Sequence, residues 1–398
     1  MQTDFDILII GGGMVGASLA CALRASGLRI GVVEAVPPRA PAQPSYDDRS
    51  VTLIPGSRRI FEAIGVWREI ERQGVTPIEH MHISDRGHCG FARFAAADAG
   101  VPALGYVVEN RALGAALWQA QQELKNVEWL CPATLESIEF RPETAVVAIN
   151  QDGARRALST RLVVAADGTD SPARAAAGIE TTRTEYKQVA VVVNVTPGRP
   201  HANTAYERFT AAGPLALVPL RDGRCAVVWC MGAPDAEAIL KCGDEEFLAR
   251  LHERFGARLG RFTRPGRRAA YPLFLARARE LARPRLALVG NAARTLHPIA
   301  AQGFNLGLRD VATLAEVVPE AARAARDIGD HDVMRRYAER RRWDNLATVA
   351  FTDGLLRIFS NDFPPLVLAR DLGLIAVDLL PPVKRALVQL AGGQALWQ

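Results

Sequence analysis

Two features that the sequence lacks, paired cysteines and long apolar runs, exclude whole classes of protein. The six cysteines form no CxxC pair and most stand among apolar residues, a pattern typical of reduced, buried thiols in a cytosolic protein. No apolar stretch approaches the roughly 20 residues that a membrane-spanning helix needs. The N-terminus also lacks the basic head and apolar run of an export signal. We therefore expect a cytoplasmic protein, with peripheral membrane association as an open alternative.

The sequence has no strong charge of either sign and no metal-ligand pattern. Its net charge of +5 is spread along the chain, and the basic stretch 335–342 is interrupted by an acid, which favours a solvated helix face over a nucleic-acid surface. His80, His82, His88 and Cys89 stand close together, but no second ligand pair has the spacing of a zinc site. We predict no nucleic-acid partner and no metal.

The first forty residues contain an ordered set of nucleotide-binding signals. The apolar run Phe5–Ile10 is typical of a strand buried in a parallel sheet, and it ends in a glycine-rich turn over 11–16 that contains G-x-G-x-x-G. A helix over 17–26 follows, then a second strand over 29–33 that ends in Glu34. Because all the pieces come in this order, the sequence predicts a Rossmann-type dinucleotide site.

Each residue of that turn has a physical task. Gly11 permits the tight turn, Gly13 lets a pyrophosphate approach the backbone, and Gly16 allows close packing of helix and strand. Met14 and Val15 open the helix, whose unpaired N–H groups and dipole attract phosphate. Glu34, about 20 residues after Gly13, is placed to accept hydrogen bonds from ribose and disfavours the 2′-phosphate of NADP at this site. The motif leaves NAD and FAD open.

Two later strands end in similar turns. The apolar stretch 161–166 stops at Asp167-Gly168, and the stretch 286–289 stops at Gly290-Asn291. Ligands of open α/β sheets collect at the carboxyl ends of strands. Three such ends indicate one long ligand, longer than an adenine dinucleotide with a free nicotinamide requires.

At these residues the chain resembles the flavoprotein aromatic hydroxylases, the group typified by p-hydroxybenzoate hydroxylase. That family combines G-x-G-x-x-G with a D-G motif, here Asp167-Gly168, and a G-D motif, here Gly290-Asn291. The stretch 297–310 resembles the signature of its ubiquinone-biosynthesis branch and is far more specific than the glycine motif. Three shorter motifs point the same way: Asp48-Arg49-Ser50, Glu109-Asn110-Arg111 and Tyr206-Glu207-Arg208-Phe209.

The resemblance implies an FAD cofactor and an aromatic hydroxylation. Backbone N–H groups around Gly303, at a helix start that also includes Phe304 and Asn305, would approach the flavin ring. This is physically sensible, because reduced flavin is anionic and a helix N-terminus stabilises negative charge. The family's reaction uses NAD(P)H as a reductant that docks transiently, and O2, which forms a C4a-hydroperoxide on the reduced flavin. The predicted cofactor-binding residues are Gly11, Gly13, Met14, Val15, Gly16, Glu34, Arg49, Arg111, Asp167, Asn291, Pro298, Gly303, Phe304 and Asn305.

Two residues depart from the family pattern. Asn291 stands where most members have Asp; an amide still hydrogen-bonds a ribityl hydroxyl but brings no charge. The Asn is similar to that of the branch acting on 2-polyprenyl-6-methoxyphenol, which guides the choice of substrate. Ala301 replaces a common Gly, so a positive φ there would strain the backbone by about 1 kcal/mol or more.

Several side chains keep a second interpretation. Arg49 is a cofactor ligand or the partner of the preceding acids Asp47 and Asp48, and Arg111 is a phosphate ligand or a surface arginine. His297 is best read as a structural, hydrogen-bonded histidine. We therefore assign no catalytic base.

The expected fold class is α/β: a Rossmann-type FAD-binding domain with an inserted, mainly antiparallel substrate domain and a helical C-terminal region. With 49% hydrophobic residues, a chain of 398 residues is long enough for two or three domains. Strand-like patterns at 190–195, 216–220 and 225–230, with a turn at 221–224, predict the inserted sheet. The expected boundaries are 1–76, 101–183 and 269–345 for the FAD-binding domain, 77–100 and 184–268 for the substrate domain, and 346–398 for the C-terminal region.

The leading hypothesis is an NAD(P)H- and O2-dependent monooxygenase that hydroxylates a polyprenylated methoxyphenol in ubiquinone biosynthesis. Two alternatives stay open: a hydroxylase of a small soluble phenol, and a non-catalytic flavin-binding scaffold of a biosynthetic assembly. The apolar segments after residue 363 either dock on the protein, on another subunit or other ubiquinone-synthesis proteins, or touch a membrane.

Overall fold

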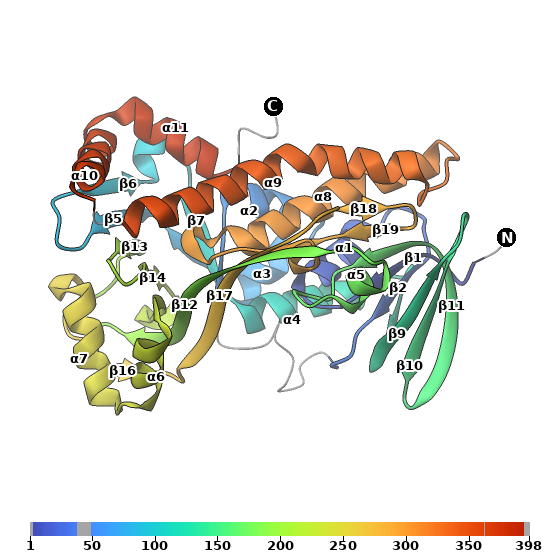
Figure 1. The fold of residues 1–398 in the computed structure, drawn as a ribbon, viewed down its shortest axis with the longest axis horizontal. Coiled ribbons are helices and arrows are strands. Elements are labelled where there is room, and N and C mark those ends of the chain that lie inside the picture. Colours follow the sequence, from blue (N-terminus) through green and yellow to red (C-terminus); the bar gives the residue numbers. More distant parts are fainter. Residues whose placement is uncertain (1–2, 38–48, 362, 394–398) are drawn as a thin grey trace.

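In the computed structural model, which describes residues 3–37, 49–361 and 363–393, the chain forms three β-sheets connected and covered by helices (Figure 1). The predicted α/β fold class is confirmed by this arrangement and by the structural likeness reported below. Among the described residues, no helix combines the length and the apolar character needed to cross a bilayer.

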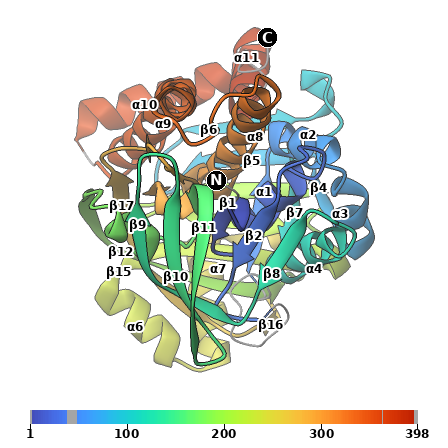
Figure 2. The ribbon, with the colours of Figure 1, turned by 90° about the vertical axis from the view of Figure 1, so that its right-hand side faces the viewer.

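The first sheet has the parallel core that the N-terminal pattern predicts. Its strand order is β18-β19-β11-β1-β2-β8, with every neighbouring pair parallel except β18 with β19. β9 and β10 extend β11 as an antiparallel hairpin, which the sequence did not predict (Figure 2). The strands are β1 (Phe5–Ile10), β2 (Ile30–Val33), β8 (Val127–Leu130), β9 (Ala133–Phe140), β10 (Ala145–Gln151), β11 (Ala154–Ala165), β18 (Ala282–Arg283) and β19 (Leu286–Leu288).

One apolar core joins this sheet to the helices on one of its faces. Side chains of α1 (Met14–Ala22), α8 (Gln302–Arg323) and α9 (His331–Phe359) pack with those of the parallel strands. α9 is the long helix that lies along α8 in Figure 1. The opposite face packs against its own cluster, which includes residues of β10 and of α5 (Pro172–Ala176). The parallel strands are thus buried on both faces, as their continuous apolar runs predict.

The second sheet is mainly antiparallel, in the order β20-β17-β12-β15-β14-β13-β5-β6, with β16 paired to β12. The predicted hairpin at 221–224 joins β14 to β15, with positive φ at Asp222 and Gly223. Two helices that the sequence did not predict, α6 (Ala233–Lys241) and α7 (Asp244–Phe255), cover one face. The strands are β5 (His80–Asp85), β6 (Phe91–Ala95), β12 (Thr181–Thr196), β13 (Thr204–Phe209), β14 (Leu215–Pro219), β15 (Cys225–Gly232), β16 (Arg264–Pro265), β17 (Ala269–Ala278) and β20 (Arg294–Thr295).

A small third sheet and three further helices sit beside α1 and α8. β3 (Ser50–Leu53) and β4 (Thr76–Ile78) both pair with β7 (Gly105–Glu109). Near this sheet lie α2 (Pro55–Ala63), α3 (Trp67–Gln73) and α4 (Asn110–Gln121), and the short 3-10 turn η2 (Ala97–Ala99) follows β6. Other 3-10 turns are η3 (Arg221–Gly223), η4 (Ala257–Leu259), η5 (Gly290–Ala292) and η6 (Ile299–Ala301).

After α9 the chain is helical, in α10 (Pro364–Leu379) and α11 (Pro381–Ala391), which lie beside β5 and β6 in Figure 1. The division into domains stays a prediction. β17, which the expected boundaries put in the FAD-binding domain, pairs along its length with β12 of the second sheet.

Candidate functional site

The ends of four parallel strands lie in one row. Ile10 is in register with Val33 on one side and with Ala165 on the other, and Ala165 is in register with Leu288. The turns that follow these residues therefore meet at one edge of the sheet. All three predicted strand ends, together with Glu34, are brought to this edge.

The first turn tolerates no side chain at two of its glycines. Gly11 has φ +101°, and a Cβ there would stand 2.5 Å from the carbonyl oxygen of Ala166. A Cβ on Gly16 would stand 1.9 Å from the carbonyl oxygen of Gly11. These contacts are the close packing of turn, strand and helix that the motif predicts, and they keep the backbone of the turn open to a ligand.

The edge carries hydrogen-bonding capacity that the protein leaves unused. α1 begins after Gly13 with no side-chain cap, so the N–H groups of its first turn, over Met14, Val15 and Gly16, are available. Glu34 accepts hydrogen bonds from the N–H groups of Gly12 (2.7 Å) and Val36 (2.9 Å). A carboxylate offers about four acceptor positions, so Glu34 keeps capacity for ribose hydroxyls.

Asp167 at the second strand end has an unused acceptor as well. One carboxylate oxygen accepts from the N–H of Ala173 (2.9 Å), whereas the other is buried and has no hydrogen-bond partner in the described part of the chain. Burial raises the pKa of this carboxyl. A buried acceptor without a partner is rare and is expected where a bound group supplies the donor.

The third strand end is held by a buried ion network that sequence reasoning missed. Gly290, with φ +59°, donates its N–H to Asp310 (3.1 Å), whose carboxylate also contacts the guanidinium groups of Arg294 and Arg341. The Asp310 side chain is fully buried. Asn291, next to Gly290, is exposed, and the structure records no hydrogen bond from its side chain to a described residue.

The network continues to a second acid. Asp344 lies 2.6 Å from Arg341 and 2.8 Å from Arg309. Although burial acts to raise it, these two arginines hold the pKa of Asp344 below its usual value. Asp310 belongs to the stretch 297–310, which resembles the signature of the ubiquinone-biosynthesis branch. Its partner Arg341 comes from α9, and nothing in the sequence marks that pairing.

The segment from Pro298 to α8 enters its helix through strained backbone. Ala300 and Ala301 have φ of 56° and 51°, in the left-handed region that L-residues rarely adopt. The positive φ considered for Ala301 is therefore present. Gly303 lies in the first turn of α8, where a Cβ would meet nothing within 4 Å, and the helix has no side-chain cap. Its first-turn N–H groups are available to a ligand.

The next two residues of the segment face the protein. Phe304 stacks on Phe61 with 6.4 Å between ring centroids. The Asn305 amide is fully used: its oxygen accepts from Ile54 N–H (3.1 Å) and from Ser57 Oγ (2.7 Å), and its nitrogen donates to the carbonyls of Thr52 and Ala301. Any contact of Asn305 with a cofactor would come from its backbone.

His297 is buried and hydrogen-bonded through both ring nitrogens. Its Nδ1 accepts from the N–H of Ile299 (3.2 Å), and its Nε2 lies 3.3 Å from Oε1 of Gln188. Burial lowers the pKa of His297 to about 4. The ring is thus neutral at physiological pH and carries its proton on Nε2, which fits a structural histidine.

The two arginine candidates are differently placed. The Arg49 guanidinium lies over the ring of Tyr271, 4.9 Å from its centroid, while Asp47 and Asp48 lie outside the described residues. Arg111 pairs with Glu109 at 3.1 Å and its side chain is about half exposed.

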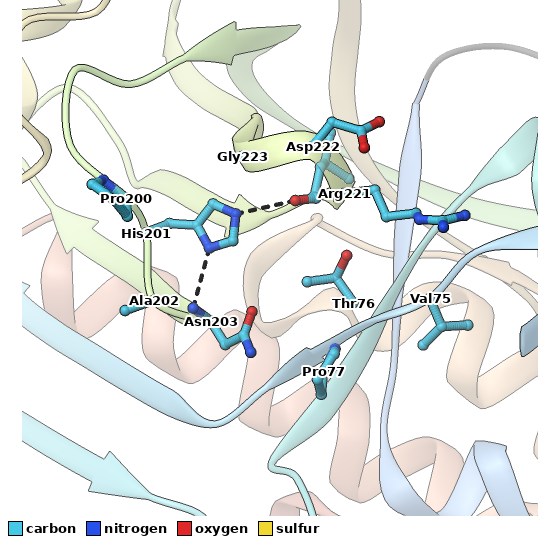
Figure 3. Close-up of a pocket in the computed structure, with 11 residues that line it drawn as sticks. Val75, Thr76, Pro77, Pro200, His201, Ala202, Asn203, Arg221, Asp222 and Gly223 are labelled. Atoms are coloured by element: carbon cyan, nitrogen blue, oxygen red, sulfur yellow. Dashed lines mark hydrogen bonds between the residues drawn. The ribbon is translucent and has the colours of Figure 1, made fainter.

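A surface pocket of ≈ 340 Å³ lies elsewhere, between β4, the loop 200–203 and the β14–β15 turn (Figure 3). His201 on its wall is hydrogen-bonded through both ring nitrogens, to the N–H of Asn203 and the carbonyl of Leu220 (Figure 3). No predicted cofactor residue lines it. Within the described ranges, no group of three or more His, Cys, Asp or Glu side chains is placed to hold a metal.

Comparisons with known proteins agree with this geometry. A family model described as an FAD binding domain matches residues 4–352. The ubiquinone hydroxylase UbiL of Rhodospirillum rubrum is 39% identical over 388 residues, which cover 98% of this chain and 89% of that protein. The 3-demethoxyubiquinol 3-hydroxylase of Escherichia coli is 32% identical over 389 residues, covering 98% of each. The crystal structure of p-nitrophenol 4-monooxygenase PnpA from Pseudomonas putida is similar in fold, with a TM-score of 0.79, 19% identity, and coverage of 98% of this chain and 97% of that one.

Proposed function

The chain belongs to the FAD-binding-domain family of FAD-dependent aromatic hydroxylases, and from that membership we propose that it hydroxylates the ring of a polyprenylated methoxyphenol in ubiquinone biosynthesis. The observation that carries the proposal is the row of strand ends with unused donors and acceptors. FAD supplies the electron transfer from NAD(P)H to O2 that no protein side chain can perform.

The described residues fit this cofactor along its length. We assign Glu34 to the adenosine ribose and the first turn of α1 to the pyrophosphate, because a carboxylate and free N–H groups suit these two groups. The unpartnered oxygen of Asp167 suits a hydroxyl donor of the cofactor. The exposed amide of Asn291 is suited to hydrogen-bond the hydroxyls of the ribityl chain. Because this amide is neutral, the electrostatic field around the ribityl chain would come from the nearby helix ends.

The first turn of α8 is assigned to the flavin ring, with Pro298, Gly303 and the backbone of Phe304 around it. Its N–H groups and helix dipole would stabilise negative charge on the reduced ring. Neutral His297, fixed between Ile299 and Gln188, orients the segment before the helix and moves no proton. Arg49 and Arg111 stay proposed ligands of the phosphates or ribityl chain.

The test is to follow NADH and NADPH oxidation by the purified holoenzyme with two substrates, a short-chain 2-prenyl-6-methoxyphenol and a small aromatic acid. The proposal expects oxidation stimulated by the prenylphenol and one added oxygen atom in the product. Stimulation only by the small acid would favour a hydroxylase of soluble phenols instead. Bound FAD that neither nicotinamide reduces would identify a non-catalytic scaffold.

We also propose that α10 and α11 contact a membrane surface, from which a polyprenyl substrate is collected. Their exposed side chains are unusually apolar, and basic residues accompany them in α11, as in helices that lie on anionic lipid. The exposed large apolar residues of this C-terminal face are Phe363, Leu368, Leu372, Leu379, Leu380, Val383, Leu387 and Leu390.

Liposome flotation tests this contact. Wild-type protein is expected to float with vesicles that contain anionic lipid, and the double variant Leu372→Glu/Leu379→Glu is expected to stay in solution. The control is Leu240→Glu, which charges an exposed leucine of α6 away from this face. Equal flotation of all three proteins, or of none, would contradict the proposal. Concentration-dependent dimers that only the double variant loses would assign the face to another subunit.

A further inference from the structure

β13 carries one acidic side chain, Glu207, on the face of the second sheet that turns away from α6 and α7. On the other face, Tyr206 packs against Phe255 of α7, with ring centroids 5.2 Å apart. Because side chains alternate along a strand, Glu207 and Phe209 point to the opposite side. Phe209 packs there against Ile299, the residue that follows Pro298. Glu207 therefore lies on the face that looks toward the segment assigned to the flavin.

Glu207 stands between two packed positions of that face. Ala205 packs with Val107 of β7, and Phe209 stacks on Phe359 of α9 with 3.7 Å between centroids. Glu207 is roughly 7 Å along the strand from each, from the rise of about 3.3 Å per residue. Its neighbours in register across the sheet are all apolar: Ile83, Ala216 and, beyond Ala216, Val228.

The carboxyl of Glu207 is a polar group on an otherwise apolar face. Among the described residues, no hydrogen bond or ion pair reaches it, although part of its surface stays accessible. Burial raises its pKa to about 7. An unpartnered carboxylate on an apolar face costs stability, and such groups concentrate where a ligand or a reaction uses them.

The geometry points to Glu207 as a catalytic residue that binds the hydroxyl of the substrate phenol and accepts its proton, an inference that rests on the proposed function. The apolar neighbours of Glu207 suit an aromatic ring. A carboxylate accepts a hydrogen bond from the hydroxyl of a neutral phenol more strongly than an uncharged acceptor does. With a pKa near physiological pH, the same group can both take up and return a proton.

In the proposed reaction, one proton moves from the phenol oxygen to Glu207 and back. The phenol O–H bond breaks, its proton moves to a Glu207 oxygen, and the electron pair left on the phenol oxygen enriches the ring. The ring carbon then gains the hydroxyl whose oxygen comes from O2, with electrons from NAD(P)H through the cofactor. That carbon releases its proton to water, which restores aromaticity, and Glu207 returns its proton to the phenol oxygen. The second oxygen atom leaves as water.

Several other titratable groups of the described residues lie on or near the face that carries Glu207. Asp85 on β5 is paired with Arg370 (2.6 Å), and burial raises the pKa of Asp85. Burial and the charge of Glu207 raise the pKa of Cys230, which titrates far above neutrality. Burial moves the pKa of Tyr186 to about 12 and that of His297 to about 4. Tyr271 of β17 also lies on this face, with the Arg49 guanidinium 4.9 Å from its ring centroid.

A binding experiment tests the inference without turnover. The FAD-loaded wild type at pH 8, where Glu207 is ionised, is expected to bind 2-prenyl-6-methoxyphenol at least about tenfold more tightly than its methyl ether, which has no proton to donate. Glu207→Gln should lose most of this preference. The control Glu185→Gln, an exposed glutamate of β12, should keep it. The same preference in Glu207→Gln as in wild type would overturn the inference.

Turnover gives a second readout. Glu207→Gln should lower kcat by about 10²- to 10⁴-fold, and the exposed control Glu185→Gln should keep the wild-type kcat. The wild-type pH profile should have a step near 7 that Glu207→Gln lacks and Glu207→Asp retains, which separates Glu207 from Asp85. An unchanged kcat and profile would refute the catalytic role.

The two proposals fail in different ways. If wild type shows the phenol preference but hydroxylates no phenol, the proposed function is wrong. Glu207 then binds the phenol hydroxyl but has no catalytic role. If wild type hydroxylates the phenol and Glu207→Gln matches it in binding and turnover, only the inference about Glu207 is wrong.

Discussion

The unpartnered Glu207 carboxyl should also make the stability of the protein depend on pH in an unusual direction. Its pKa is raised from 4.5 in the unfolded chain to about 7 in the fold. Each pKa unit corresponds to about 1.36 kcal/mol, so the ionised group destabilises the fold by about 3 kcal/mol once the pH exceeds 7. Between pH 4.5 and 7 the native state holds more protons than the unfolded state, and this part of the stability falls as pH rises.

Glu207→Gln removes this cost because the amide does not ionise. We expect the FAD-saturated variant to be more stable than wild type by up to about 3 kcal/mol at pH 8, and by less than about 1 kcal/mol at pH 5. Urea unfolding at both pH values measures the difference. Glu185→Gln, whose side chain is exposed and paired with Arg183, serves as the control and should follow wild type. A gap between wild type and Glu207→Gln that does not widen with pH would refute the reasoning.

Three further substitutions test the cofactor edge. Gly16→Ala puts a Cβ 1.9 Å from a carbonyl oxygen and should abolish FAD binding in a fluorescence titration, whereas Gly354→Ala, in open space on α9, should leave it intact. Asp310→Asn leaves two buried arginines short of a counter-charge and should cost about 3–5 kcal/mol in unfolding experiments. FAD binding should weaken as well, because one amide oxygen replaces the two carboxylate oxygens that hold Gly290, Arg294 and Arg341. Ala301→Gly, at φ 51°, should gain about 1 kcal/mol of stability; a loss would show that the left-handed backbone there is unstrained.

The parallel core could be predicted from sequence because its signals are local. The run Phe5–Ile10, the glycine turn and Glu34 each constrain a few adjacent residues, and the structure aligns them in register as the pattern requires. The resemblance to the ubiquinone-biosynthesis branch is confirmed by relatives that match nearly the whole chain. FAD as cofactor and the monooxygenase class follow from the same family.

What the sequence did not predict depends on pairing between distant segments. Helices α6 and α7 were read as part of a strand-rich region, because the neighbouring strands dominate the pattern there. Arg341, a partner of Asp310, comes from α9. The apolar surroundings of Glu207 become visible only once three strands and the helices packed against them are assembled. Such contacts have no fixed spacing along the chain.

The cofactor-binding residues themselves stay a prediction. Asn305 illustrates why. Its side-chain amide is fully hydrogen-bonded to Thr52, Ile54, Ser57 and Ala301. Its presence in the stretch 297–310 therefore has at least one structural reason. A motif residue can therefore hold the site in shape without touching the ligand.

The most direct test of the strand-end site is a titration of FAD into the apoprotein, followed by flavin fluorescence. We predict saturable binding of one FAD per chain, lost in Gly16→Ala and kept in Gly354→Ala. An apoprotein that stays colourless and binds no FAD, or a Gly16→Ala variant that binds it as wild type does, would contradict the account.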